Sequence, residues 1–218
     1  MKKITWIFFS FFAFISANAQ IGIIEGLNSA TIPTGWTQVG GFGSTTTTPC
    51  EGSHAYRDNL YITSPTGNFT SPNYVGASNG TDLTVAFQWK ATEWSAGAGV
   101  GFTVNVEYST DNGTSWIAIG DPILASTVTE CADFSSVVPD ASLPEGSDFK
   151  FRVRETWTSG DCYFWIDNIS ITQVTALPPN CDAALTSPVD GSAEVNLTGV
   201  LSWSPATGLP SSYILSVG

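Results

Sequence analysis

One stretch near the end of the chain predicts how the fold closes: Tyr163-Phe164-Trp165-Ile166-Asp167-Asn168-Ile169-Ser170-Ile171. Side chains two residues apart share one face of a β-strand. One face of this strand would carry Tyr163, Trp165, Asp167, Ile169 and Ile171. An ionised carboxylate on an otherwise apolar face needs a cation, a metal ion or several backbone N–H groups as partners. We therefore interpret Asp167 as a structural anchor within reach of a calcium ion; the alternative is a β-bulge that turns its side chain out to solvent.

The chain begins with an export signal. Two lysines precede an apolar run from Ile4 to Ile15, and Ala17-Asn18-Ala19 supplies small residues at the cleavage positions. Residues 1–19 are therefore predicted to be a secretory signal peptide, and the mature chain to start near Gln20. No later stretch is long and apolar enough to span a bilayer, so we expect a secreted protein without a membrane span.

The composition is strongly acidic. Of the 218 residues only 12% are charged, and the net charge is −12. Two of the seven basic residues lie in the signal peptide, which leaves five basic and nineteen acidic residues in the mature chain. This balance repels phosphate backbones and argues against binding to nucleic acid. It is compatible with binding calcium outside the cell.

Alternating apolar and polar residues predict several strands. The clearest are Leu83–Trp89, Phe102–Tyr108 and Phe149–Val153. Asn112-Gly113 tolerates positive φ and predicts a hairpin that leads into Ser115–Ile119. No helical periodicity of useful length occurs, so the pattern predicts an all-β, two-sheet sandwich. Its core is expected to contain Phe87, Trp116 and Trp165.

A domain boundary is expected near the C-terminal end. Leu177-Pro178-Pro179 interrupts the strand pattern, so we predict one domain over residues 20–175 and a linker over residues 176–182. Another β pattern, with Leu201-Ser202-Trp203 as an early strand, follows in residues 183–218. This unit is far shorter than the roughly 100 residues of an immunoglobulin-like sandwich, so we expect a truncated second domain.

Four cysteines remain after export: Cys50, Cys131, Cys162 and Cys181. In an oxidising compartment they are expected to form disulfides, and the sequence alone allows three connectivities. A zinc site is not expected, because no Cys-x-x-Cys spacing occurs and His54 is the only histidine.

The side-chain types of a hydrolase triad occur at Ser53, His54 and Asp58. All three lie within one short stretch, whereas a triad is normally assembled from separated elements. The Gly-x-Ser-x-Gly motif is also missing. We therefore do not expect this chain to be an enzyme.

Two tryptophans are candidates for binding a sugar ring. Trp94 and Trp157 lie at strand ends beside glycine-containing loops, where an exposed aromatic ring could stack on a saccharide. The alternative is that both side chains cap the ends of the core.

Several short motifs follow one another in a particular order: Pro33–Trp36, Arg57–Leu60, Thr63–Pro65, Tyr108–Trp116 and Ile166–Ile169. In this order they resemble the MAM-like jelly-roll domains of bacterial (Bacteroidetes-type) secreted surface proteins, often called choice-of-anchor domains. The resemblance implies a concanavalin A-like jelly roll in residues 20–175. The segment from Cys181 onward resembles the start of a fibronectin type III-like or immunoglobulin-like module.

The resemblance also implies specific site residues. A calcium ion would tie the first strand to the last through Glu25 and Asp167, with Asp58 as a looser third ligand. The resemblance implies a Cys50–Cys131 bridge. A further Cys162–Cys181 bridge would then join the last strand to the linker.

The function implied by the resemblance is a non-catalytic adhesion or carbohydrate-binding module of a larger protein, secreted or held at the outer-membrane surface. The partner would be an extracellular polysaccharide, a cell-surface glycan or a protein. The alternative is an accessory domain of a secreted peptidase or glycoside hydrolase whose catalytic domain lies outside this chain.

Overall fold

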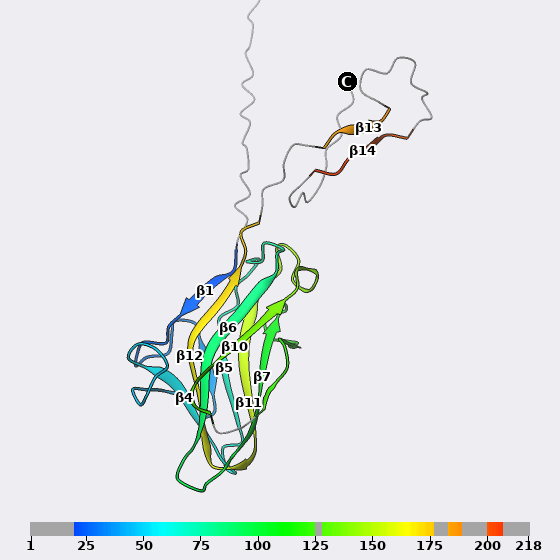
Figure 1. Ribbon diagram of the computed structural model, residues 1–218. Helices are drawn as coiled ribbons and strands as arrows, with labels where there is room; N and C mark the ends of the chain where they lie inside the picture. Colours follow the sequence, from blue (N-terminus) through cyan, green and yellow to red (C-terminus); the bar gives the residue numbers. More distant parts are fainter. Residues whose placement is uncertain (1–19, 125–127, 177–182, 189–199, 207–218) are drawn as a thin grey trace, which may run out of the picture.

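The computed structural model describes residues 20–124, 128–176, 183–188 and 200–206. The predicted signal peptide and nearly all of the predicted linker lie outside these ranges. Residues 20–176 form two antiparallel sheets that pack as a sandwich (Figure 1), and no α-helix occurs among the described residues. The predicted all-β, two-sheet fold is therefore confirmed. The described part of the chain also contains no helix that could cross a membrane.

The first sheet has the strand order β10-β6-β12-β4-β3, with β1 paired to β12. Its strands are β1 (Gly22–Glu25), β3 (Gly43–Thr45), β4 (Ala55–Leu60), β6 (Leu83–Glu93), β10 (Val128–Val138) and β12 (Cys162–Gln173).

The second sheet has the order β2-β5-β11-β7-β8, with β9 paired to β7. Its strands are β2 (Thr37–Val39), β5 (Thr66–Thr70), β7 (Val100–Ser109), β8 (Ile117–Ala118), β9 (Ile123–Leu124) and β11 (Lys150–Gly160). The predicted hairpin between β7 and β8 is present, with Asn112 and Gly113 at φ 58° and 90°. A short 3-10 helix, Asp140–Ser142, follows β10.

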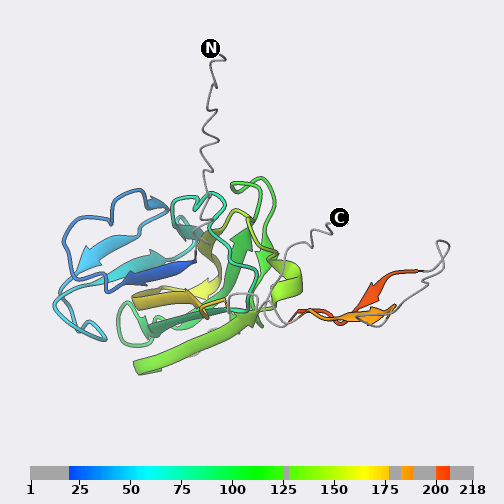
Figure 2. The same ribbon diagram turned by 90° about the horizontal axis from the view of Figure 1, so that it is seen from above.

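The first strand of the sandwich, β1, pairs with the last strand, β12. One side of β12 pairs with β6 along its length. The other side pairs with β4 through residues 162–166 and then with β1 through residues 169–172. Figure 2 shows β1 (blue) lying beside β12 (dark yellow). Asn168 lies between these two partners with φ 50°, and the register against β6 shifts there.

This β-bulge changes which side chains of β12 face the core. Before it, Cys162, Phe164 and Ile166 are fully buried in the core; after it, the core-facing residues are Ile169 and Ile171. Asp167 lies opposite Gln88 on the outer face. The expectation that Tyr163, Trp165, Asp167, Ile169 and Ile171 share one face is therefore wrong, because the extra residue at Asn168 reverses the alternation.

Two of the three predicted core aromatics lie outside the core. Phe87 is buried between the sheets, as predicted. Trp165 is buried on the outer face of the first sheet, where the Lys90 ammonium group lies 5.2 Å from its ring centroid. Trp116 is partly exposed, and the Arg152 guanidinium lies 3.9 Å from its ring centroid. Periodicity alone did not reveal which face of each strand would be covered.

The outer face of the first sheet is covered in part by residues 46–54, which connect β3 to β4 and are called the staple loop here. The disulfide Cys50–Cys131 joins this loop to β10, with the two Cα atoms 5.7 Å apart. The predicted first bridge is therefore confirmed. It indicates an oxidising compartment, consistent with an extracellular location.

The second β unit is described only in part. β13 (Leu185–Ser187) and β14 (Ser202–Trp203) form an antiparallel pair. The fibronectin type III-like assignment and the truncation stay predictions, since most of residues 183–218 lies outside the described ranges.

Candidate functional site

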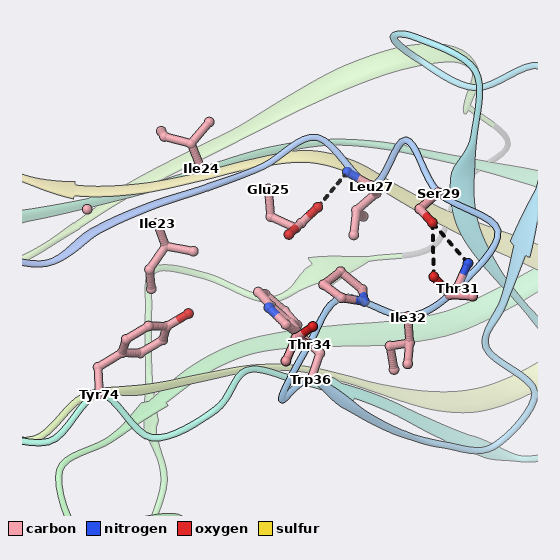
Figure 3. A pocket seen from close by; sticks show the side chains of 12 residues that line it. Ile23, Ile24, Glu25, Leu27, Ser29, Thr31, Ile32, Thr34, Trp36 and Tyr74 are labelled. Carbon is pink, nitrogen blue, oxygen red and sulfur yellow. Dashed lines mark hydrogen bonds between the residues drawn. The ribbon is translucent and has the colours of Figure 1, made fainter.

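A hollow of the described surface opens beside β1. It has a volume of about 570 Å³ and is lined by β1, by residues 27–36 and by Tyr74. Figure 3 shows Glu25 and Tyr74 pointing into this hollow from opposite sides, with Trp36 between them. We call it the edge cleft, because it lies where β1 of the first sheet approaches the chain that enters β2 of the second.

Local structure fixes each side chain of the edge cleft. In β1, Ile23 is buried and Ile24 is 70% exposed, so the strand alternation directs Glu25 to the inner side. Glu25 Oε1 accepts a hydrogen bond from the Leu27 N–H at 3.1 Å, which holds the carboxylate in place. Two backbone hydrogen bonds with Phe149, of 2.8 and 3.0 Å, attach the backbone of Tyr74 to the second sheet.

The floor of the edge cleft is aromatic and rigid. Trp36 is buried and its ring stacks on Phe69 with centroids 4.8 Å apart. Ile23 and Ile32 add apolar walls, and Thr34 adds a hydroxyl. The exposed lining of the cleft is more polar than apolar, and its apolar part lies at the floor and on the walls.

The edge cleft holds a hydrogen-bond donor opposite an acceptor. Burial raises the pKa of Tyr74, and the negative charge of Glu25 raises it further. The Tyr74 phenol therefore stays protonated at neutral pH and can donate, while the Glu25 carboxylate can only accept. This arrangement suits a ligand rich in hydroxyl groups.

Asp167 is an anchor for the staple loop. Its Oδ2 accepts hydrogen bonds from the N–H groups of Cys50 and Glu51 at 2.9 and 3.0 Å, and its Oδ1 accepts one from Asn168 at 2.8 Å. Burial raises the pKa of Asp167, and these three N–H groups oppose the rise. Asp167 is therefore held by backbone N–H groups. These are one of the three expected kinds of partner, the others being a cation and a metal ion. The alternative of a solvent-facing side chain is wrong because the staple loop covers it, although the bulge itself exists.

Lys90 reinforces this anchor. Its ammonium group donates to the Thr48 carbonyl and, at 2.8 Å, to the Thr48 hydroxyl. Burial lowers the pKa of Lys90, and the negative charges of Asp167 and Glu130 oppose the change. The staple loop is therefore fixed from below by an acid and a base, and at its side by the disulfide.

The three predicted calcium ligands do not form a common site. Glu25 faces the edge cleft on the inner side, Asp167 faces the staple loop on the outer side, and Asp58 is fully buried in β4. Among the described residues, no group of three or more acidic, histidine or cysteine side chains is positioned to hold a metal ion. These three residues therefore do not fit one calcium ion.

The second predicted disulfide is contradicted at Cys162, which is a free, fully buried thiol with its Sγ 3.8 Å from the Leu60 carbonyl oxygen. Chain length explains why. Cys162 and Gln173 are the two ends of β12, about 35 Å apart at the usual rise of a strand. Residues 174–181 span at most about 28 Å when extended, which is less than the length of β12. Cys181 itself lies outside the described residues.

The three candidate triad residues are not assembled. Ser53 Oγ lies 2.8 Å from His54 Nδ1 on the staple loop. Asp58 instead points into the core of the sandwich, where it is fully buried. No hydrogen bond joins Asp58 to His54 among the described residues.

The two candidate sugar-binding tryptophans lie away from the edge cleft. The backbone N–H of Trp94 donates to the backbone carbonyl of Asp161, next to the start of β12, whereas β1 pairs with the other end of that strand. Trp94 is 56% exposed, so its role in sugar binding stays a prediction. Trp157 packs against the core and donates from Nε1 to the Gly160 carbonyl at 2.9 Å, which matches the alternative of a core cap.

A smaller hollow of about 250 Å³ lies on the outer face near β3 and β4. The Arg57 guanidinium lies 4.0 Å from the ring centroid of Tyr163, and both side chains line this hollow. It offers an aromatic ring and a cation, but the cation covers the ring.

Sequence reasoning did not find Trp36 and Tyr74 as cleft residues, nor Lys90 and Glu155 as buried charges. Glu155 could have been found, because it follows Phe151 and Val153 at the spacing of the core face. Lys90 lies on the polar face of β6, and its burial comes from contact with the staple loop. Trp36 and Tyr74 carry no such signal, because they lie in connections outside the strands.

No family model and no curated protein matches this chain. Several solved structures share its fold. The CBM22-1 xylan-binding domain of Xyn10C from Paenibacillus barcinonensis aligns over 74% of this chain and 100% of that chain, with 17% identity and a TM-score of 0.50. The tandem CBM22-1-CBM22-2 structure of the same protein aligns over 77% of this chain and 49% of its own, with 17% identity and a TM-score of 0.52.

An exo-β-agarase aligns over 72% of this chain and 26% of that chain, with 10% identity and a TM-score of 0.53. At these identities the likeness shows the fold, a β-sandwich that is also used by carbohydrate-binding modules. The finer assignment to a MAM-like family stays a prediction.

Proposed function

We propose that this chain is a non-catalytic extracellular module that binds a saccharide in the edge cleft, as part of a larger secreted or surface protein. The observation that carries the proposal is the pairing of Glu25 and Tyr74 across an apolar floor formed by Trp36.

The chemistry of the edge cleft matches that of a sugar. A sugar ring has hydroxyl groups at its rim and C–H groups on its faces, so it needs both hydrogen-bonding groups and apolar surface. Glu25 can accept from one or two hydroxyls and Tyr74 can donate to another. A volume of about 570 Å³ lies within the usual range of ligand sites.

The fold and the predicted export support the same proposal. Solved structures with this sandwich include a domain described as xylan-binding and an exo-β-agarase, which makes plant and algal polysaccharides the first probes to use. The Cys50–Cys131 disulfide fits an extracellular site of action. If the larger protein contains a hydrolase, the module would hold that hydrolase on its substrate; without one, it would act in adhesion to a glycan or to a protein that carries one.

The test is binding of the full chain to soluble polysaccharides, by affinity electrophoresis and calorimetry, followed by a glycan array. Tyr74→Phe removes one hydrogen-bond donor, and Glu25→Gln removes the charge and replaces one accepting oxygen by an NH2 group, so each is expected to weaken binding by about 5- to 30-fold. The matched controls Glu145→Gln and Tyr61→Phe change the same residue types at exposed positions outside the cleft and should leave binding unchanged.

Two outcomes would contradict the proposal. One is that no polysaccharide or glycan binds. The other is that binding occurs but is unaffected by both cleft variants. In the second case, a loss of binding on Tyr163→Ala would move the site to the hollow beside Arg57.

A further inference from the structure

Two carboxylates face each other inside the sandwich, away from the edge cleft. Asp58 comes from β4 of the first sheet and Glu155 from β11 of the second, and both are fully buried. None of their four oxygens has a hydrogen-bond partner of good geometry among the described residues. The N–H groups of Asn59 and Gly41 lie near Asp58, but not at hydrogen-bond geometry. The Asp58 and Glu155 carboxyl groups lie close enough to share a proton, and without that proton neither can donate to the other. Buried and unpartnered carboxylates are rare and need an explanation.

Glycines surround the two carboxylates. A Cβ added at Gly67 would overlap Asp58 Oδ2 and lie 2.8 Å from Glu155 Oε2. The two carboxylates therefore both approach the backbone of Gly67. A Cβ at Gly41 would overlap Asp58 Oδ1. At Gly40, which has φ 89°, a Cβ would lie 3.0 Å from Asp58 Oδ2 and 2.7 Å from the Thr66 carbonyl oxygen. At these three glycines the backbone lies so close to Asp58 that no side chain would fit between them.

This place has a clear position in the fold. Residues 40–42 connect β2 of the second sheet to β3 of the first, so the chain crosses between the sheets here. Asp58 and Glu155 reach toward this crossover from the two sheets. Whatever holds the two carboxylates together would also fasten one sheet to the other.

The pair is not neutralised by a basic side chain. Both ion pairs found in the described part of the chain involve Glu107, which contacts Arg152 and Arg154 on the outer face. Burial raises the pKa of Asp58 to about 6. Burial and the charge of Asp58 raise the pKa of Glu155 well above its usual value. Two negative charges cannot stay buried together without a proton or a cation between them.

We propose that Asp58 and Glu155 bind a calcium ion between the two sheets, at the crossover formed by Gly40 and Gly41. Calcium prefers carboxylate and carbonyl oxygens, and one divalent ion balances the two carboxylates. The Thr66 carbonyl oxygen lies close enough to add a neutral ligand. This site shares only Asp58 with the set implied by the resemblance, and it does not rest on the proposed saccharide binding.

The competing explanation is a proton shared by the two carboxyl groups. The titratable groups near the pair are few: β12 contributes the Cys162 thiol, whose pKa is raised mainly by burial and also by the charges of Asp161 and Glu155. The crossover and β5 contribute no titratable side chain. If the pair binds calcium, added calcium should stabilise the protein and displace the proton. If the pair only shares a proton, added calcium should have no effect.

The test uses the full chain after removal of metal with a chelator. Calorimetry with calcium chloride and metal analysis are expected to give one calcium per chain. Calcium at about 100-fold above its dissociation constant should raise Tm by about 5 to 10 °C. Glu155→Gln and Asp58→Asn should abolish this shift. The matched surface controls Glu145→Gln and Asp121→Asn should keep it.

Infrared spectroscopy separates the two explanations even if the variants do not fold. In the calcium-free protein at pH 7 the carbonyl band of a buried carboxylic acid should be present, and saturating calcium should remove it. The proposal is overturned if calcium leaves Tm unchanged, or if the acid band persists at saturating calcium. It is also overturned if folded Glu155→Gln binds calcium as tightly as the unmodified chain.

The pH dependence gives an independent check. Raised pKa values mean that the folded chain favours the protonated acids. Without calcium, stability should therefore be highest at acid pH and fall as pH rises from about 4, the usual carboxyl pKa, through the folded value of about 6 for Asp58. Calcium should remove most of this fall, and a fall that is the same with and without calcium would count against the site.

Discussion

Removal of the Cys50–Cys131 bridge should destabilise the sandwich chiefly through its unfolded state. The two cysteines are separated by 81 residues. Closing a loop of that length lowers the entropy of the unfolded chain by about 15 cal/mol/K, which corresponds to about 4.5 kcal/mol at 25 °C. This value is an upper estimate, because real unfolded chains are more compact than a random coil. We therefore expect Cys50→Ser/Cys131→Ser to lose about 3 to 4.5 kcal/mol.

The native state should change little in this double variant. The staple loop keeps its hydrogen bonds from Cys50 and Glu51 to Asp167, and Lys90 still donates to Thr48. The Glu51 amide should therefore stay protected from hydrogen exchange under native conditions. The loss of stability should appear as a lower midpoint in urea, measured against the oxidised chain and against the chain reduced with a thiol.

Two results would refute this reasoning. A loss of less than about 1 kcal/mol would show that the bridge does not constrain the unfolded chain as expected. Fast exchange of the Glu51 amide in the folded double variant would show that the bridge, and not Asp167, holds the staple loop.

Three further predictions concern single side chains. Glu107→Gln should cost about 1 to 2 kcal/mol in urea unfolding, because Glu107 contacts Arg152 at 2.6 Å and Arg154 at 3.0 Å and its loss leaves two like charges adjacent; a cost below about 0.3 kcal/mol would contradict this. Asn168→Val should be less stable than Asn168→Gly by about 1 to 2 kcal/mol, because φ is 50° at this position, and equal stability would refute the assigned bulge. Cys162 should be alkylated only in denaturant, because burial shields the thiol and raises its pKa, and peptide mass spectrometry showing labelling of the folded chain would disprove this.

Much of the sandwich could be predicted from local alternation. β6 and β7 each have one face in the core and the other outside, so their polar and apolar residues alternate over many positions. The hairpin after β7 was also readable, because Asn112-Gly113 adopts positive φ more easily than other pairs. In these elements the neighbours in sequence determine the structure.

The alternation of β12 was misassigned because one residue interrupts it. A bulge leaves no mark in a hydrophobic pattern except a change of phase, and Ile166 and Ile169, which flank Asp167-Asn168, are both apolar. The available signal was Asn168 itself, since asparagine accepts positive φ better than most residues. The pairing with two different strands on the same side of β12 could not be predicted, because it depends on contacts far apart in sequence.

The buried acids show a different limit. Asp167 was singled out as the acid placed most plainly in an apolar pattern, yet Phe151, Val153 and Glu155 follow the same spacing and all three are fully buried. Arg152 and Arg154, which alternate with them, lie on the outer face of the same strand. Identifying Asp58 as the partner of Glu155 requires knowing that β4 and β11 belong to facing sheets, which no local pattern reveals.

The extra residue at Asn168 divides β12 into two halves of opposite parity. Adding or deleting one residue between Cys162 and Asp167 would exchange inward and outward side chains in the β4-paired half alone, and a change after Asn168 would do so only in the half beside β1. Length differences in this strand should therefore be tolerated only in steps of two within either half. Deletion of Asn168 itself would remove the interruption, so that Ile166 and Ile169 would stand two positions apart and the core residues of both halves would share one face of a regular strand.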